Sequence, residues 1–333
     1  MTDALLRVDG LTTRFATERG EVTAVDDVSF SIGRGEIVGL VGESGCGKSV
    51  TAASVMRLLD ERYTSYSGSV VLEGNDLLAM SDRRMRRERG NTVSMVFQDP
   101  MTALNPVFTV ENQLIEAIRA HRTISKAEAR ETALRLLNEV GIPDAENRMR
   151  AYPHQLSGGM RQRVVIAMAL SSQPRLLIAD EPTTALDVTI QSQILELMLS
   201  LRAEYETGVV LITHDLGVVA QTCDRVLVMY LGQIIEDASV NDLFAQLHHP
   251  YTRGLLGATP SVDSDADDEL EVIPGRVPSL HDVPTGCRFA DRCRFVTEQC
   301  RQAPPPLEAV EGGRKVRCWN YRTVIAEEVP DVA

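Results

Sequence analysis

The sequence lacks any long hydrophobic run. No stretch of its 333 residues approaches the roughly 18 consecutive apolar residues that a membrane-spanning helix needs. The first residues, 1–4, also lack the charged-then-apolar pattern of a secretion signal. We therefore expect the protein to stay inside the cell and to contact any membrane only peripherally.

Positive charge is scarce relative to negative charge. The 34 lysines and arginines face 47 acidic residues, which gives a formal net charge of −13. Nucleic-acid binding depends largely on lysine and arginine neutralising phosphates, so this balance argues against a nucleic-acid partner. The basic run at residues 83–89 is interpreted as a solvated helical face. No internal repeat is visible, so we expect one catalytic module rather than two.

Short apolar segments alternate with helical ones over much of the chain. This alternation predicts an α/β architecture with a largely parallel sheet. Between about residues 98 and 163 the pattern becomes helical, with a capping box of Ser125 and Glu128 and a helix stop at Gly141. Strands are expected at 36–41, 70–72, 93–97, 176–179, 209–213 and 226–230.

These shifts in pattern predict three parts. Residues 1–97 and 164–237 form the α/β core, and residues 98–163 form a helical subdomain inserted into it. Residues 238–333 form a C-terminal extension, in which the acidic stretch 263–271 is interpreted as an exposed loop. We expect the proline-rich, cysteine-containing tail that follows to be a small accessory domain.

A glycine-rich segment after the predicted strand 36–41 matches the phosphate-binding pattern G-x-x-x-x-G-K-[ST]. Glycines let the backbone curl so that successive N–H groups point at phosphate oxygens, and the following helix adds its positive dipole end. Lys48 is expected to reach the β- and γ-phosphates, and Ser49 to ligate Mg²⁺. The predicted nucleotide-binding loop comprises Gly42, Glu43, Ser44, Gly45, Cys46, Gly47, Lys48 and Ser49.

The predicted apolar strand 176–179 ends in two adjacent acids. Open α/β sheets bind ligands at the carboxyl ends of their strands, so Asp180 is expected to hold Mg²⁺ beside the phosphate-binding loop. Glu181 can orient and deprotonate an attacking water, a general-base role worth about 10²- to 10⁴-fold in rate. The sequence therefore predicts a P-loop nucleoside triphosphatase.

Four of the six cysteines crowd the end of the chain, separated by five, six and seventeen residues. In an intracellular protein, cysteines favour metal or core roles over disulfides. Thiolates suit zinc or an iron–sulfur cluster, although zinc sites usually use tighter C-x-x-C pairs. A cluster, a zinc site and plain thiols or a disulfide all stay open for Cys287, Cys293, Cys300 and Cys318.

One short segment identifies a family. Residues 156–160 read L-S-G-G-M and resemble the ABC signature LSGGQ, with methionine in place of the usual glutamine. Further elements follow in the family's order, since Gln98 resembles the Q-loop glutamine, Asp187 the D-loop aspartate and His214 the switch histidine. Phe15 is expected to stack on adenine. The resemblance implies a RecA-like ABC ATPase core with an inserted helical subdomain.

Three further stretches resemble the dipeptide/oligopeptide branch of ABC importers, namely 97–106, 152–157 and 249–256. The resemblance implies a subunit that hydrolyses ATP to power peptide uptake at the cytoplasmic face of the inner membrane. The implied partners are a second ATPase subunit, by family precedent a paralogue, two transmembrane permeases and an extracytoplasmic peptide-binding protein. Related tails carry a [4Fe-4S] cluster, which the four cysteines would then hold.

The resemblance also assigns roles that spacing alone does not. Two cassettes of this family close head-to-tail around ATP, so part of each site comes from the facing subunit. The residues expected to contact that subunit's ATP are Ser157, Gly158, Gly159 and Asp187. Those expected at Mg²⁺ are Ser49, Gln98 and Asp180. Those expected to share the catalytic work are Glu181, His214 and Gln98.

Two alternatives to a peptide importer stay open. The cargo is chosen by other subunits, so nickel, glutathione or a sugar stands beside peptides. A non-transport ABC ATPase acting on ribosomes or chromosomes fits less well, because this chain carries neither a second cassette nor a long coiled-coil insertion.

Overall fold

The computed structural model describes residues 4–99, 103–183, 188–258 and 272–327. The chain divides into two compact units, which are described separately. The first comprises Met1–Arg7, Ser31–Ile37 and Val71–Ile212, and the second Val8–Phe30, Val38–Val70 and Thr213–Ala333. The predicted division into core, helical subdomain and extension stays a prediction.

Unit 1 contains a parallel ribbon of buried strands. β7 (Leu176–Asp180) lies between β6 (Val93–Val96) and β8 (Gly208–Ile212), parallel to both. Every residue of β7 and β8 is buried, which is what a continuous apolar run predicts for a parallel sheet. Three of the expected strands are therefore confirmed, and their carboxyl ends meet at one edge.

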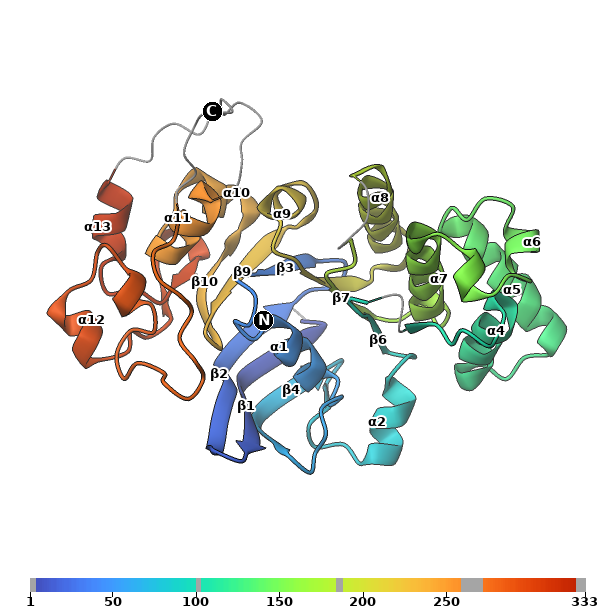
Figure 1. The fold of residues 1–333 in the computed structure, drawn as a ribbon, viewed down its shortest axis with the longest axis horizontal. Coiled ribbons are helices and arrows are strands. Elements are labelled where there is room, and N and C mark those ends of the chain that lie inside the picture. The colour runs from blue at the N-terminus through green and yellow to red at the C-terminus, as the bar shows by residue number, and fades with distance from the viewer. Residues whose placement is uncertain (1–3, 100–102, 184–187, 259–271, 328–333) are drawn as a thin grey trace. The chain divides into compact units, whose positions relative to one another are not determined.

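The remainder of unit 1 is mainly helical. α4 (Val110–His121), α5 (Lys126–Glu139) and α7 (Gly158–Leu170) pack against one another, as Figure 1 shows. Shorter elements are β5 (Asn75–Asp76), α2 (Asp82–Glu88), α6 (Ala145–Arg148) and the 3₁₀ turn η1 (Pro153–Gln155). The long helix α8 (Val188–Tyr205) completes this unit.

The capping box predicted at the start of α5 is present. The Ser125 hydroxyl accepts a hydrogen bond from the Glu128 amide at 3.2 Å, and the Glu128 carboxylate accepts one from the Ser125 amide at 2.8 Å. The helix stops before Gly141, whose positive φ of 71° suits glycine far better than other residues. Both ends of this helix were thus readable from the sequence.

Unit 2 contains two sheets. The first pairs β1 (Leu6–Thr17) with β2 (Gly20–Ile32) and with β4 (Thr64–Leu72). In the second, β3 (Ile37–Val41) runs parallel to β9 (Arg225–Tyr230), which is antiparallel to β10 (Gln233–Ser239). The pairs β10–β12 (Lys315–Val316) and β12–β11 (Glu308–Ala309) extend that sheet with residues from the end of the chain.

Short helices surround the second sheet. They are α1 (Lys48–Val55), α9 (Leu216–Thr222), α10 (Val240–Ala245), α11 (Pro250–Gly257), α12 (Glu298–Gln302) and α13 (Tyr321–Ala326), with 3₁₀ turns η2 (Ala290–Arg292) and η3 (Glu311–Gly313). Apolar residues of α9, α10 and α11 join one core with β9 and β10, in which Tyr230, Tyr251 and Phe289 are all buried. The C-terminal extension therefore shares a hydrophobic core with β9 and β10.

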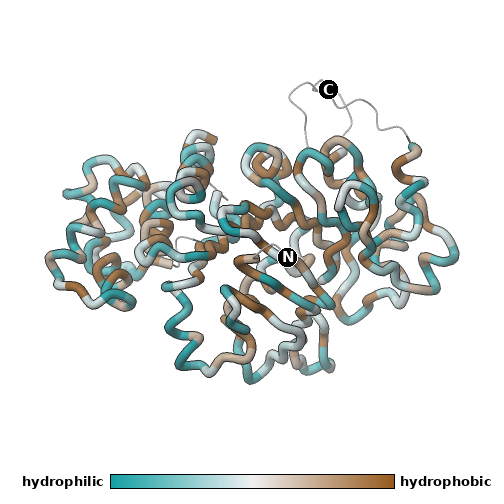
Figure 2. The backbone as a smooth tube through the Cα atoms, turned by 180° about the vertical axis from the view of Figure 1, so that it is seen from behind, coloured by the Kyte–Doolittle hydropathy of each residue, from teal (hydrophilic) through white to brown (hydrophobic). Residues whose placement is uncertain are grey.

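Hydrophobic and hydrophilic residues alternate along much of the chain. Figure 2 shows brown and teal segments following one another along the tube, which is expected where an element buries one face and exposes the other. Within the described ranges, none of the helices combines the length and the apolarity needed to cross a bilayer.

Candidate nucleotide-binding site

The phosphate-binding loop lies in unit 2, between the end of β3 at Val41 and the start of α1 at Lys48. Its curl requires glycine, since a Cβ on Gly42 would lie 2.2 Å from the Met229 carbonyl oxygen. Gly47 also has a positive φ, of 108°. The predicted strand–loop–helix arrangement is therefore confirmed.

Lys48 is folded back onto this loop. Its side chain is buried, and Nζ donates hydrogen bonds to the carbonyl oxygens of Gly42 at 2.7 Å and Glu43 at 3.0 Å. Cys46 Sγ lies 3.8 Å from the same Nζ, and burial raises the pKa of that thiol. In contrast, three other loop residues are exposed to solvent: Ser44, Gly45 and Ser49. The loop thus places the Lys48 ammonium, which is bound by two carbonyl oxygens, next to residues that are exposed to solvent.

Two further predicted residues lie in unit 2. His214 is exposed, and its neighbour Asp215 caps α9 by accepting hydrogen bonds from the amides of Gly217 at 2.8 Å and Val218 at 3.1 Å. This cap fixes the backbone beside His214 and leaves the imidazole at the surface. Phe15 is half-buried on β1.

Unit 1 brings together two of the predicted catalytic residues. Gln98 Nε2 donates a hydrogen bond to Glu181 Oε2 at 2.8 Å. The parallel register, in which Val96 pairs with Ala179, explains this contact because both residues follow the carboxyl ends of neighbouring strands. Asp180, the last residue of β7, is buried. The amide of Gln98 therefore holds the carboxylate that the sequence assigns to the attacking water.

Glu181 also has an unusual backbone. Its φ is 45°, in the left-handed region that non-glycine residues seldom adopt, and its amide donates to the Ile212 carbonyl oxygen at 2.9 Å. Such conformations cost of order 1–3 kcal/mol and concentrate at functional sites. This geometry gives Glu181 a fixed position at the end of the sheet.

The signature segment forms the N-terminus of α7. Ser157 is the N-cap, and its hydroxyl accepts a hydrogen bond from the Met160 amide at 3.3 Å. Both Ser157 and Gly158 are exposed, so the positive end of a 13-residue helix faces solvent. Gly159 lies against Ile190, which a Cβ would approach to 3.0 Å.

A further residue, Gln162, was not singled out from the sequence. Its buried Nε2 donates a hydrogen bond to the Pro182 carbonyl oxygen at 2.8 Å, which connects the signature helix to the turn that follows Glu181. Gln162 lies between Arg161 and Arg163, so the local sequence carried no signal that this amide is buried. Asp187, the predicted D-loop residue, lies outside the described residues.

The four C-terminal cysteines all belong to unit 2. The Cys287 amide donates to the Cys300 carbonyl oxygen at 2.7 Å, and Cys300 Sγ contacts the Thr297 hydroxyl at 3.3 Å. Burial, followed by repulsion from neighbouring thiolates, raises the pKa of Cys293 to about 11 and that of Cys318 to about 12. Among the residues that the structure describes, no three His, Cys, Asp or Glu side chains are arranged to hold a metal ion.

Two protein families match parts of the sequence. "ABC transporter" matches residues 25–184, and "Oligopeptide/dipeptide transporter, C-terminal region" matches residues 235–300. These segments include, respectively, the phosphate-binding loop with the Glu181 turn and the part of the chain that contains α11 and the first three clustered cysteines.

Two similar curated proteins align over nearly their whole length. A probable peptide ABC transporter ATP-binding protein, y4tR, of Sinorhizobium fredii is 51% identical and covers 97% of this chain and 97% of its own. The oligopeptide transport ATP-binding protein AppD of Bacillus subtilis is 50% identical and covers 97% of this chain and 99% of its own.

Solved structures show similar folds. A dimeric ATP-binding cassette in a post-hydrolysis state with ADP and phosphate has a TM-score of 0.64 and 26% identity, over 71% of this chain and 98% of its own. Clostridium perfringens cbiO1, part of an ABC transporter complex, has a TM-score of 0.62 and 28% identity, over 73% of this chain and 91% of its own.

Proposed function

Because this chain belongs to the ABC transporter ATP-binding family and carries the C-terminal region of its oligopeptide/dipeptide branch, we propose that it is the ATP-hydrolysing subunit of a peptide importer. The observation that carries the enzymatic part is the hydrogen bond between Gln98 and Glu181. This hydrogen bond restrains the Glu181 carboxylate at the end of β7. The preceding residue, Asp180, corresponds to the acid that the family uses for Mg²⁺. Peptide cargo is supported by relatives that align end to end.

The proposed reaction is transfer of the γ-phosphoryl group of ATP to water. The oxygen of the attacking water bonds to the γ-phosphorus while Glu181 accepts a proton from that water. The bond between the γ-phosphorus and the bridging oxygen breaks, which releases ADP and phosphate. The Gln98 amide donates to one oxygen of the Glu181 carboxylate and so restrains its orientation. His214 is proposed to hold the γ-phosphate through its exposed imidazole.

Binding is proposed to rest on the glycine loop. Its amides and the Lys48 ammonium would hold the phosphates, with Lys48 exchanging its present carbonyl partners for phosphate oxygens. Mg²⁺, when bound, neutralises charge on the phosphate oxygens. Ser49, Asp180 and Gln98 are proposed as its ligands because their hydroxyl, carboxylate and amide oxygens are donors of the type that Mg²⁺ prefers. Phe15 is proposed as the adenine contact.

A facing cassette is proposed to complete the site. The exposed, capped N-terminus of α7 is suited to an anion, and Ser157, Gly158 and Gly159 are its first residues. We propose that they contact ATP held by the second ATPase subunit, together with Asp187. The further partners are two permeases and an extracytoplasmic peptide-binding protein, so this subunit would sit at the cytoplasmic face of the membrane through the permeases.

The four C-terminal cysteines are proposed to hold a [4Fe-4S] cluster. The support is the donor set, four thiols from one small segment, because iron–sulfur clusters are held by thiolates. Its role would be to cross-link a tail that is too short to form an apolar core of its own. Iron and acid-labile sulfide should be found together after anaerobic purification. Zinc without sulfide, or neither metal nor sulfide, would overturn this assignment and leave the ATPase proposal intact.

Replacing the proposed base tests the enzymatic role. Glu181→Gln keeps the side chain's size and its hydrogen bond to Gln98, but its amide takes no proton from water. We expect turnover to fall at least ~100-fold while ATP still binds. The matched control is Glu206→Gln, at an exposed glutamate of unit 1 with a similar φ of 52°. Near-normal hydrolysis by Glu181→Gln would refute this role.

A further inference from the structure

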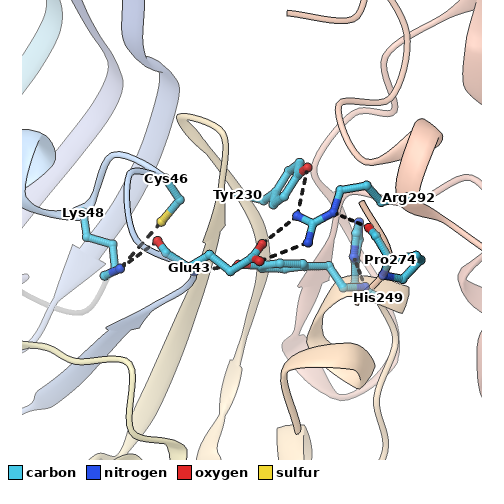
Figure 3. Close-up of polar contacts among 8 residues, drawn as sticks. Glu43, Cys46, Lys48, Tyr230, His249, Pro274 and Arg292 are labelled. Carbon is cyan, nitrogen blue, oxygen red and sulfur yellow. Dashed lines mark hydrogen bonds and ion pairs between the residues drawn. The ribbon is translucent and has the colours of Figure 1, made fainter. Parts of the chain in front are cut away.

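The phosphate-binding loop contains a carboxylate that must be directed away from phosphate. Glu43 is the second residue of the loop, and Figure 3 shows its side chain extending away from Lys48 toward Arg292. The contact is bidentate, with Arg292 Nη1 at 2.7 Å from Glu43 Oε2 and Nη2 at 3.0 Å from Oε1. Parallel hydrogen bonds of this type are strong and geometrically specific. The loop is thus paired with a residue of the C-terminal extension.

Arg292 is held in place before it meets Glu43. The residue is only 6% exposed, and its Nε donates to the Pro274 carbonyl oxygen at 2.9 Å. Its guanidinium carbon lies 5.8 Å from the ring centres of both Tyr230 and Phe289. Since the neighbouring groups fix the guanidinium, little side-chain freedom is lost in forming the ion pair.

The backbone of Glu43 is held by the same extension. Its amide donates a hydrogen bond to the Tyr251 hydroxyl oxygen at 2.7 Å. Tyr251 is fully buried, and its ring centre lies 4.7 Å from that of Tyr230 and 5.5 Å from that of Phe289. The start of α11 is fixed too, because the Tyr251 amide donates to His249 Nδ1 at 3.0 Å.

The electrostatic consequence follows from where Glu43 sits. An unpaired carboxylate within a few ångströms of a triphosphate repels it, and a partly buried pair of like charges is screened little by salt. Arg292 cancels this charge and keeps the carboxylate directed away from Lys48. The ion pair therefore favours a loop that attracts anions.

We propose that Arg292 and Tyr251 are positioning residues for ATP binding, which neutralise and orient Glu43 so that the phosphate-binding loop accepts a triphosphate. The inference rests on the proposed function of that loop. It makes the C-terminal extension part of the nucleotide site, although neither residue belongs to a nucleotide-binding motif. Arg292 directly precedes Cys293, so a disturbance of the cysteine tail should reach the loop through Glu43.

The test asks whether removing the Glu43 charge restores MgATP binding in a variant that lacks Arg292. The quantity measured is the dissociation constant of MgATP for the full-length chain. Arg292→Gln leaves Glu43 as an unpaired anion and should weaken MgATP binding about 10-fold, and MgADP binding less. Adding Glu43→Gln to that variant removes the anion and should restore affinity to within about 3-fold. Arg292→Lys keeps the positive charge but loses the bidentate contact. Its dissociation constant for MgATP should lie between those of the unaltered chain and of Arg292→Gln. A purely structural role for Arg292 predicts no recovery in the double variant.

A matched control lies in the same segment. Arg288 pairs with Asp26 of β2 rather than with the loop, so Arg288→Gln should stay within about 2-fold of the unaltered chain. Equal MgATP binding by Arg292→Gln and the unaltered chain, or no recovery in the double variant, would overturn the inference. Lys48→Ala separates the two ideas: if it too binds MgATP normally, the proposed nucleotide site itself is wrong.

Discussion

Two cationic side chains of unit 2 and two polar side chains of unit 1 differ in their burial. In unit 2, Lys48 and Arg292 are buried and satisfied by fixed partners. In unit 1, Gln98 and Ser157 are exposed at the ends of a strand and a helix. In the proposed binding role, Arg292 is already held by fixed partners and needs little reorganisation, whereas Lys48 exchanges two carbonyl partners for phosphate oxygens. The roles proposed for the exposed groups of unit 1, activation of water and contact with a second cassette, need access from outside instead.

If this comparison is right, the largest effect on stability should come from a buried acid of unit 2. Glu236 of β10 is fully buried, and burial raises its pKa to about 7 despite hydrogen bonds from the Thr252 hydroxyl and the His248 amide. Folding therefore favours the protonated carboxyl. Its contribution is fully present below the unfolded pKa of 4.5 and is lost as pH rises through 7.

Glu236→Gln mimics the protonated form and should remove this pH dependence. We expect the variant to be more stable than the unaltered chain at pH 8, by on the order of 2–3 kcal/mol, and similar to it near pH 4. Denaturant unfolding at both pH values measures the difference. Glu308→Gln, at an exposed carboxyl of β11, should change stability little at either pH. Equal stability of Glu236→Gln and the unaltered chain at pH 8 would argue against a strained buried acid.

An intermediate effect is expected from the exposed pair of unit 1, and on rate rather than on stability. Gln98→Ala removes the amide that holds Glu181, so kcat should fall about 10-fold with unfolding free energy changed by less than about 0.5 kcal/mol. Steady-state ATPase assays in the transporter complex measure it. Gln221→Ala, at an exposed glutamine of α9, serves as the control. A large loss of stability with an unchanged kcat would contradict the prediction that this exposed pair acts on rate rather than on stability.

The smallest effect should come from two helix caps of unit 1 with the same chemistry. Ser125→Ala and Ser157→Ala each remove a hydroxyl that accepts an amide N–H, and each should cost about 1 kcal/mol of stability. Only Ser157→Ala should also lower ATPase activity of the assembled transporter, by a few-fold, because only that helix end is proposed to face a nucleotide. Equal ATPase activity in the two variants would leave Ser157 a cap alone.

Much of the site could be predicted because its determinants are local. The loop after β3 requires glycine at Gly42 and Gly47, and the capping box of α5 lies within four residues, so both were readable as patterns. The strands expected at 93–97, 176–179 and 209–213 are β6, β7 and β8. An apolar run bounded by turn residues carries its own signal, whatever it later packs against.

The sequence by itself determined which groups can do chemistry, since residue type and short spacing decide a phosphate loop, a capped helix or an acid at a strand end. Only the tertiary structure decided which of them meet. Gln98 reaches Glu181 through the register of two strands, and Glu43 meets Arg292 across 249 positions of chain. Such contacts depend on how strands pair and how a shared aromatic core packs, and neither leaves a periodic trace along the chain.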